Sequence, residues 1–158
     1  MVLCALMSGC GGSAGSRPPS PSSALITAAA CALVSSAEVS TAFQEQVQAG
    51  TKASGDGEIE NECLFISEHG LAQGSVAVEV VSGVMASTFY ANGQQKLTSA
   101  APVSGVGDKA LLEADGSAIL AIKGQIAVFI AALLTDETVA ERGDGCVRLV
   151  KLVLSKTG

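Results

Sequence analysis

Apolar residues alternate with polar or small residues in two segments of the chain, and two further segments are short runs rich in β-forming apolar residues; both patterns are typical of β-strands. Two of the segments meet around Lys123-Gly124, which predicts a β-hairpin. In the first segment Cys63 and Phe65 share one face, so we expect Cys63 to point into the core. The expected strands are residues 61–67, 74–83, 117–123 and 125–133.

Helical patterns surround these strands. Ser35 and Glu38 have capping-box spacing, and apolar residues follow at helical intervals, which predicts a first helix. Residues 84–95 predict a short second helix. Residues 135–137 predict the N-cap and the acidic first turn of a C-terminal helix, which the glycine-containing sequence 143–145 could split in two.

Together these elements predict a single α+β domain. We expect an antiparallel sheet of about four strands, with the N-terminal and C-terminal helices packed on one face. A chain of 158 residues suits one domain and a tail. Because the chain has one Tyr, four Phe and no Trp, its core must be built mainly from Ala, Val, Leu and Ile.

The charge of the chain excludes one class of partner. The formal net charge is −6, and the nine Lys and Arg residues are scattered singly along the sequence. No basic stripe is present to neutralise phosphates, so we expect no nucleic-acid partner. We also expect the domain to be a monomer.

The opening residues resemble the end of a bacterial lipoprotein signal. In residues 7–10, small residues precede Cys10, as in a lipobox, where the cysteine is acylated and becomes the mature N-terminus. No Lys or Arg precedes this motif, so we expect the true start codon to lie upstream. Residues 10–23 are rich in Gly, Ser and Pro and predict a flexible tether.

These observations predict three divisions of the chain and its location. A truncated lipoprotein signal occupies residues 1–9, the tether residues 10–23, and the α+β domain residues 24–158. The lipid on Cys10 would hold the domain on the outer face of the cytoplasmic membrane or in the cell envelope. The membrane is therefore the first expected partner.

Three cysteines would then remain in the domain, in a compartment where disulfides form. Cys31, Cys63 and Cys146 allow one bridge and one leftover thiol. A bridge between residues 31 and 63 would close a loop of about 30 residues and stabilise the fold by roughly 3–4 kcal/mol. Cys146 would then be a buried small hydrophobic residue. The pairs 31–146 and 63–146 stay open as alternatives.

Three stretches of the chain, residues 31–43, 62–66 and 102–130, together resemble a family. The family consists of actinobacterial cell-envelope lipoproteins that share a small domain of unknown function. The shared pattern is a Cys-x-Leu segment before a helix, a cysteine on the next strand, and a Gly-x-Gly-Asp-x-Ala loop before two strands. It covers most of residues 29–133, and the matching positions are Cys31, Leu33, Cys63, Gly105, Gly107, Asp108 and Ala110.

The resemblance implies a Cys31–Cys63 disulfide and an exported location, and it supplies no activity. The chain departs from the family pattern at Leu64, because the family often has an aromatic residue directly after the second cysteine. The glycine-containing sequence 143–145 is also foreign to the pattern.

The candidate chemistry is sparse, and we expect no metal and no cofactor. His69 is the single histidine, which excludes a metal site with two imidazoles, and its turn context predicts a solvated side chain. The acidic residues of 56–62 predict a solvated edge, because metal-loop spacing is missing. Gly105, Gly107 and Asp108 form a possible loop site for an anion, and the alternative is a tight turn.

Three function classes follow, in order of preference. The first is a surface-tethered binding or interaction module, which fits a tether, a compact domain and the lack of a catalytic cluster. The alternative is a carrier of a small apolar ligand in a cavity between sheet and helices. An enzyme ranks last, because Asp108 and Glu113 would have to converge in a cleft.

Overall fold

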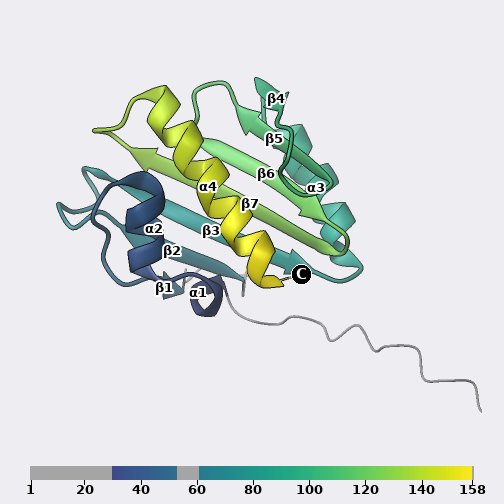
Figure 1. Ribbon diagram of the computed structural model, residues 1–158, viewed down its shortest axis with the longest axis horizontal. Helices are drawn as coiled ribbons and strands as arrows, with labels where there is room; N and C mark the ends of the chain where they lie inside the picture. Colours follow the sequence, from purple (N-terminus) through teal and green to yellow (C-terminus); the bar gives the residue numbers. More distant parts are fainter. Residues whose placement is uncertain (1–29, 53–60, 158) are drawn as a thin grey trace, which may run out of the picture.

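The computed structural model describes residues 30–52 and 61–157, which form an α+β fold with one antiparallel sheet. Seven strands lie in the order β1-β2-β3-β7-β6-β5-β4 (Figure 1). The strands are β1 (Thr51–Lys52), β2 (Glu62–Ile66), β3 (Gly74–Ser82), β4 (Ala100–Pro102), β5 (Lys109–Glu113), β6 (Ala118–Lys123) and β7 (Ile126–Leu134). The helices are α1 (Ala30–Leu33), α2 (Ser36–Phe43), α3 (Met85–Lys96) and α4 (Val139–Thr157). The expected signal, the tether and Cys10 lie outside the described residues.

The expected sheet of about four strands is wrong, because the sheet has seven. The four expected strands are β2, β3, β7 and β6, which lie next to one another in the middle of the sheet. The other three, β1, β4 and β5, are five residues or shorter, and among them Ala110 alone is buried. Backbone pairing to a neighbouring strand holds them in place, and this leaves no period of two in the sequence.

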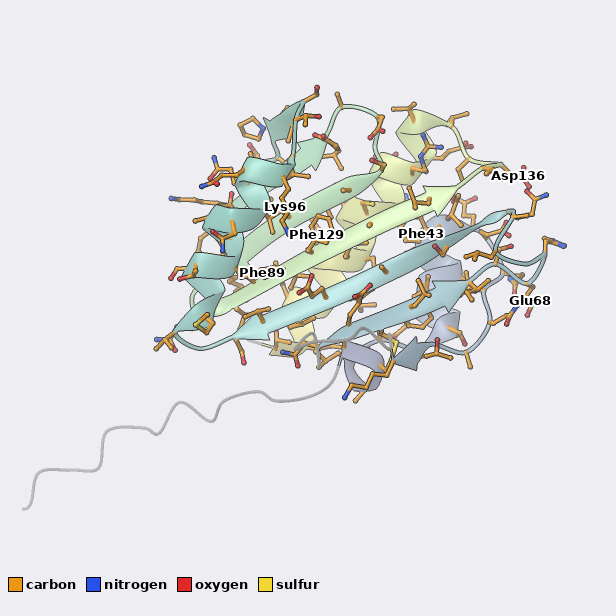
Figure 2. All side chains as sticks on the ribbon, turned by 180° about the vertical axis from the view of Figure 1, so that it is seen from behind. Phe43, Glu68, Phe89, Lys96, Phe129 and Asp136 are labelled. Carbon is orange, nitrogen blue, oxygen red and sulfur yellow. A yellow bond between two sulfur atoms is a disulfide. The ribbon has the colours of Figure 1, made fainter. Side chains whose placement is uncertain are left out.

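The N-terminal helix α2 and the C-terminal helix α4 lie on one face of the sheet as expected, but α3 covers the opposite face, which the sequence did not predict. Helices α2 and α4 pack against each other on the face seen in Figure 1, where α4 crosses β6 and β7. Helix α3 lies on the opposite face, against β3, β6 and β7 (Figure 2). The reason lies in β6, because Ile119 and Ala121 are buried on one face and Leu120 on the other. Such a strand needs cover on both faces.

The larger core lies between the sheet and the pair α2 and α4. Its small aliphatic side chains surround Phe65, which is fully buried on β2 beside Cys63. The prediction that Cys63 points into the core is confirmed. Helix α2 approaches α4 closely where Gly145 faces Phe43, since a Cβ at Gly145 would overlap the phenyl ring.

Helix α4 is continuous from Val139 to Thr157, so residues 143–145 do not split it. Gly145 permits α4 to pack closely against Phe43 of α2, and that contact outweighs the cost of a glycine in a helix at this position. The helix begins after Thr138, and not within residues 135–137. Thr138 Oγ1 accepts a hydrogen bond from the Glu141 N–H at 3.3 Å, and the Glu141 carboxylate accepts one from the Thr138 N–H at 2.9 Å.

Other local predictions are confirmed. Ser35 and Glu38 form the capping box at the start of α2. Strands β6 and β7 form the hairpin, with Lys123 paired to Ile126. Within the ranges that the structure describes, no helix has both the length and the apolar character needed to cross a membrane.

Candidate functional site

The side of the sheet that carries α3 is the candidate site, because the helix covers only part of it. Figure 2 shows that, among the residues that the structure describes, no helix lies in front of β2, β3 and the C-terminal half of β7. We call this surface the open face. The register and alternation of the three strands give its residues, which are Glu62, Leu64, Ile66, Ser75, Ala77, Glu79, Val81, Phe129, Ala131 and Leu133.

The alternation of β3 explains how the sequence builds this surface. Val76, Val78 and Val80 are buried beneath α2 and α4, so the residues between them must point to the other side. Those residues are only half-buried. Leu133 at the far end of β7 is 64% exposed. Within the described part of the chain, the open face is therefore a mostly apolar sheet surface with incomplete cover, which is typical of an interaction site.

A groove of about 230 Å³ lies where the open face meets α3. Helix α3 contributes residues spaced by three and four positions, which fall on one side of the helix. Strand β3 supplies the floor. The lining residues are Asn61, Glu79, Val81, Met85, Thr88, Phe89 and Asn92.

Glu79 is the charged group of this groove. It lies directly across from Glu62 on β2 and from Phe129 on β7. Burial raises the pKa of the Glu79 carboxyl, the nearby Glu62 raises it further, and Lys96 on α3 opposes both effects. Within the described part of the chain, the Glu79 carboxylate accepts no side-chain hydrogen bond and forms no salt bridge. Its charge is thus incompletely compensated.

The loop site expected from the sequence has a structural role. The Asp108 carboxylate accepts a hydrogen bond from the Gly124 N–H at 2.7 Å, and the Asp108 N–H donates to the Ile122 carbonyl at 2.8 Å. A Cβ at Gly107 would overlap that same carbonyl, and Gly107 has a φ of 56°. These contacts fasten the loop to the β6–β7 hairpin, as the tight-turn alternative requires.

The same loop also lines a cavity. Gly105, Gly107 and Asp108 form one wall, and Tyr90 and Gln94 of α3 form another, around a volume of about 500 Å³. Burial raises the pKa of the Tyr90 hydroxyl. This cavity lies between α3 and the strands β4 and β5 at the edge of the sheet. A carrier of a small apolar ligand would need a cavity between the sheet and a helix.

The carboxylates considered for catalysis do not converge. Asp108 precedes β5 and binds the hairpin turn, whereas Glu113 ends β5 and accepts hydrogen bonds from the backbone of Thr98 and Ser99. His69 is exposed, as predicted. Among residues 30–52 and 61–157, no group of three or more His, Cys, Asp or Glu side chains could hold a metal ion.

The cysteines of the domain are fully assigned. Cys31 and Cys63 form a disulfide, which is the pairing that the family resemblance implies. Cys146 is buried and free, and burial raises the pKa of its thiol to about 12. The thiol is therefore protonated and unreactive at neutral pH, as expected for a buried small hydrophobic residue.

Sequence reasoning missed a second cluster, at the start of α4. The carboxylate oxygens of Glu137 and the Nε of Arg142 are buried, and none of them has a hydrogen-bond partner within residues 30–52 and 61–157. Burial raises the pKa of Glu137 to about 7, with Glu141 adding to the effect and Arg142 opposing it. The Arg142 guanidinium donates to the carbonyls of Leu134 and Asp115. No local signal marks this cluster, because tertiary packing of the β7–α4 loop creates it.

The chain has a distant likeness to one solved structure, a GTP binding regulator from Thermotoga maritima. The two chains are 11% identical, the match covers 75% of this chain and 88% of that one, and the TM-score is 0.40. A likeness this weak does not support an inference about fold or function. No protein-family model and no curated protein matches the chain.

Proposed function

We propose that the chain is an exported, lipid-anchored envelope protein whose domain is a binding module that docks a protein partner on the open face. The observation that carries the docking is that the described helices cover β2, β3 and β7 incompletely, which leaves a mostly apolar sheet surface beside a groove. A protein partner suits this surface because it extends over three strands and its central residues are small. Ala77 and Ala131 lie opposite each other there.

The proposed location has separate support. The disulfide between Cys31 and Cys63 supports this location, because such bonds form and persist mainly in oxidising compartments. Cys10 lies in a lipobox-like sequence and is followed by a stretch with the composition of a tether. A lipid on Cys10 would keep the domain near its partner at the membrane and raise the effective concentration of both.

Photo-cross-linking in cells with the native envelope tests the docking. A photoreactive amino acid would replace Leu133 or Leu64 on the open face, and Lys151, which is exposed on α4, would carry the control. We expect both open-face positions to give one shared protein adduct, identified by mass spectrometry, and the control to give none. Equal adducts at Lys151, or none at the open face, would overturn the docking function.

Intact mass spectrometry of the protein recovered from membranes tests the location. The chain would be expressed with its upstream region and measured with and without reduction. We expect a mass for an acylated chain that begins at Cys10, together with a gain of about two daltons on reduction of one disulfide. An unprocessed chain with free thiols would overturn both the anchor and the compartment.

A carrier of a small apolar ligand is the second candidate, and the cavity of about 500 Å³ favours it. Tyr90 offers an aromatic wall and a hydroxyl, while Leu111 adds apolar surface. The test is mass spectrometry of lipids that co-purify with the protein, with Tyr90→Ala as the variant. A lipid that is retained by the original chain and lost from this variant would favour the carrier over the docking module.

A further inference from the structure

The groove beside α3 is lined partly by oxygen acceptors and partly by apolar side chains, and this combination suits one kind of side chain. Its polar lining consists of the Glu79 carboxylate, the amides of Asn61 and Asn92 and the Thr88 hydroxyl, all of which offer oxygen acceptors. Its apolar lining comes from Val81, Met85 and Phe89. Among the described residues that line the groove, none is Lys, Arg or His. A cation with several donors and an apolar stem would therefore satisfy both parts of the lining.

From this we infer that the groove receives an arginine side chain of the docked partner, and that Glu79 is the group that binds its guanidinium. The inference rests on the proposed docking function and names the chemistry of the partner. The guanidinium is planar, offers five donors, and pairs with carboxylates through two hydrogen bonds. Its weakly hydrated face can also lie against an aromatic ring, which Phe89 supplies.

The state of Glu79 supports this assignment. The carboxylate is half-buried and faces a second carboxylate, Glu62, across the β2–β3 pair. Burial raises the pKa of Glu79, and Glu62 raises it further, as expected for a carboxylate that forms no salt bridge within the described residues. A cation brought into the groove would compensate that charge, whereas an acidic or neutral partner would leave it buried and unpaired.

Lys96 is the competing cation within the chain. It lies on α3 near enough to lower the pKa of Glu79, yet it is exposed and forms no salt bridge with it among the described residues. Figure 2 shows Lys96 at one end of α3, and Phe89 lies nearer the other end. Lys96 therefore weakens the groove's attraction for a cation without filling the groove.

A second copy of the chain is a poorer occupant of the open face. Two open faces that met would bring two pairs of Glu62 and Glu79 into one interface, and like charges at close range are costly. The net charge of −6 adds to this repulsion. A basic partner would be attracted by the same carboxylates that repel a second copy of the chain.

The test uses the full chain under oxidising conditions and N-acetyl-arginine methylamide as the probe. Two-dimensional ¹⁵N NMR would follow backbone amide shifts during a titration, with N-acetyl-citrulline methylamide as the neutral isostere. We expect saturable shifts at Glu79, Val81, Phe89 and Asn92 with the arginine probe, and weak unsaturated shifts with citrulline. Shifts of equal size with both probes, or none in the groove, would overturn the inference.

Two variants and a matched control test the roles of Glu79 and Lys96 in binding the arginine probe. Glu79→Gln should weaken binding of the arginine probe by about tenfold or more, because a charge-assisted hydrogen bond is lost. Lys96→Gln should strengthen it by about two- to fivefold, because the competing cation is removed. Asp144→Asn changes the same charge at an exposed position of α4 and should leave the affinity unchanged. Unchanged affinity in Glu79→Gln would contradict the assignment.

The two proposals fail in different ways. Arginine-specific shifts in the groove, with no cross-linked partner at the open face, would leave the groove chemistry standing and overturn the docking function. A cross-linked partner without arginine-specific shifts would leave the docking standing and overturn the arginine assignment. Self-association of the chain, measured by analytical ultracentrifugation, would overturn the choice of a basic partner over a second copy.

Discussion

Glu137 and Arg142 show how a buried charge can remain partly unsatisfied in a stable fold. The Arg142 guanidinium donates three hydrogen bonds to backbone carbonyls, among them that of Glu137, while its Nε and the Glu137 carboxylate oxygens have none. The carboxyl therefore favours its neutral form, and burial raises its pKa to about 7. The opposite holds at Glu38, where the hydrogen bond from Lys156 lowers the pKa to about 2.

The Glu137 carboxyl should make stability fall as the pH rises. Because its pKa in the folded state is about 7 against an ordinary value of 4.5, the stability that it contributes is complete below pH 4.5 and is lost as the pH rises through about 7. Glu137→Gln keeps a neutral group throughout. We expect the variant to raise Tm at pH 8 by about 2–4 °C, after allowance for solvent screening, and to leave it unchanged at pH 4.5.

Thermal unfolding followed by circular dichroism at both pH values would measure this effect. Glu68→Gln, on an exposed turn residue, is the matched control and should leave Tm unchanged at either pH. A difference between Glu137→Gln and the original chain that does not vary with pH would refute the proposed cause.

Gly145 and Gly143 lie two positions apart on α4 and should respond oppositely to alanine. A Cβ at Gly145 would overlap the Phe43 ring, so Gly145→Ala should lower the free energy of unfolding by about 1–3 kcal/mol. A Cβ at Gly143 would meet Leu112 at an ordinary contact distance of 3.4 Å. Gly143→Ala should therefore leave stability unchanged or raise it by up to about 1 kcal/mol, through helix propensity.

Urea unfolding of the two alanine variants would measure these free energies. Equal effects would mean that α2 and α4 can separate slightly without loss, and that the contact between Gly145 and Phe43 does not limit their packing.

At the scale of the element, local sequence signals identify the central strands and the starts of helices. They identify short outer strands poorly, and they do not show whether a glycine interrupts a helix. The alternation in β3 and the capping box at Ser35 depend on neighbours in sequence, and both are present in the structure. The short strands β1, β4 and β5 depend on backbone pairing with distant segments, and they escaped prediction. Gly143 and Gly145 look like a helix break until the position of Phe43 is known.

The candidate site escaped prediction for the same reason. Glu79 in an alternating strand is visible in the sequence, but its significance depends on α3 lying on the second face of the sheet. The apolar run of β6 and β7 is the signal that could have shown this, because a strand that is apolar on both faces needs cover on both. The groove itself depends on where α3 packs across the sheet, and no local sequence pattern encodes that position.

The capping box of α2 gives an element-scale prediction. Ser35 and Glu38 exchange hydrogen bonds there, and Glu38 also binds Lys156 of α4 at 2.7 Å. Ser35→Ala should lower the free energy of unfolding by about 1 kcal/mol, because an N-terminal backbone donor loses its acceptor. Ser36→Ala, one residue further on, should change it by less than about 0.5 kcal/mol. Urea unfolding would measure both, and equal losses would contradict the role of the cap.

At the scale of the whole molecule, the disulfide links the start of the domain to the middle of its sheet. The two cysteines are 32 residues apart in sequence, and their Cα atoms lie 5.0 Å apart. Reduction should lower the free energy of unfolding by about 3–4 kcal/mol, because the unfolded chain regains the freedom that the loop removes. Urea unfolding with and without reductant would measure the loss.

Cys146→Ala is the control for this experiment. The thiol of Cys146 is buried and takes no part in the bridge, so the variant should keep the same sensitivity to reductant as the original chain. A variant that no longer responds to reductant would mean that Cys146 exchanges into the bridge.

The position of the disulfide also determines how the domain would bear a mechanical load. A pull at the N-terminal side of the domain enters at α1 and passes through the Cys31–Cys63 bond directly into β2. Helix α2 and strand β1 lie between the two cysteines in sequence, so they would carry no tension. The 32-residue separation between the cysteines would therefore be missing from the extended length of a stretched chain until the bond was reduced.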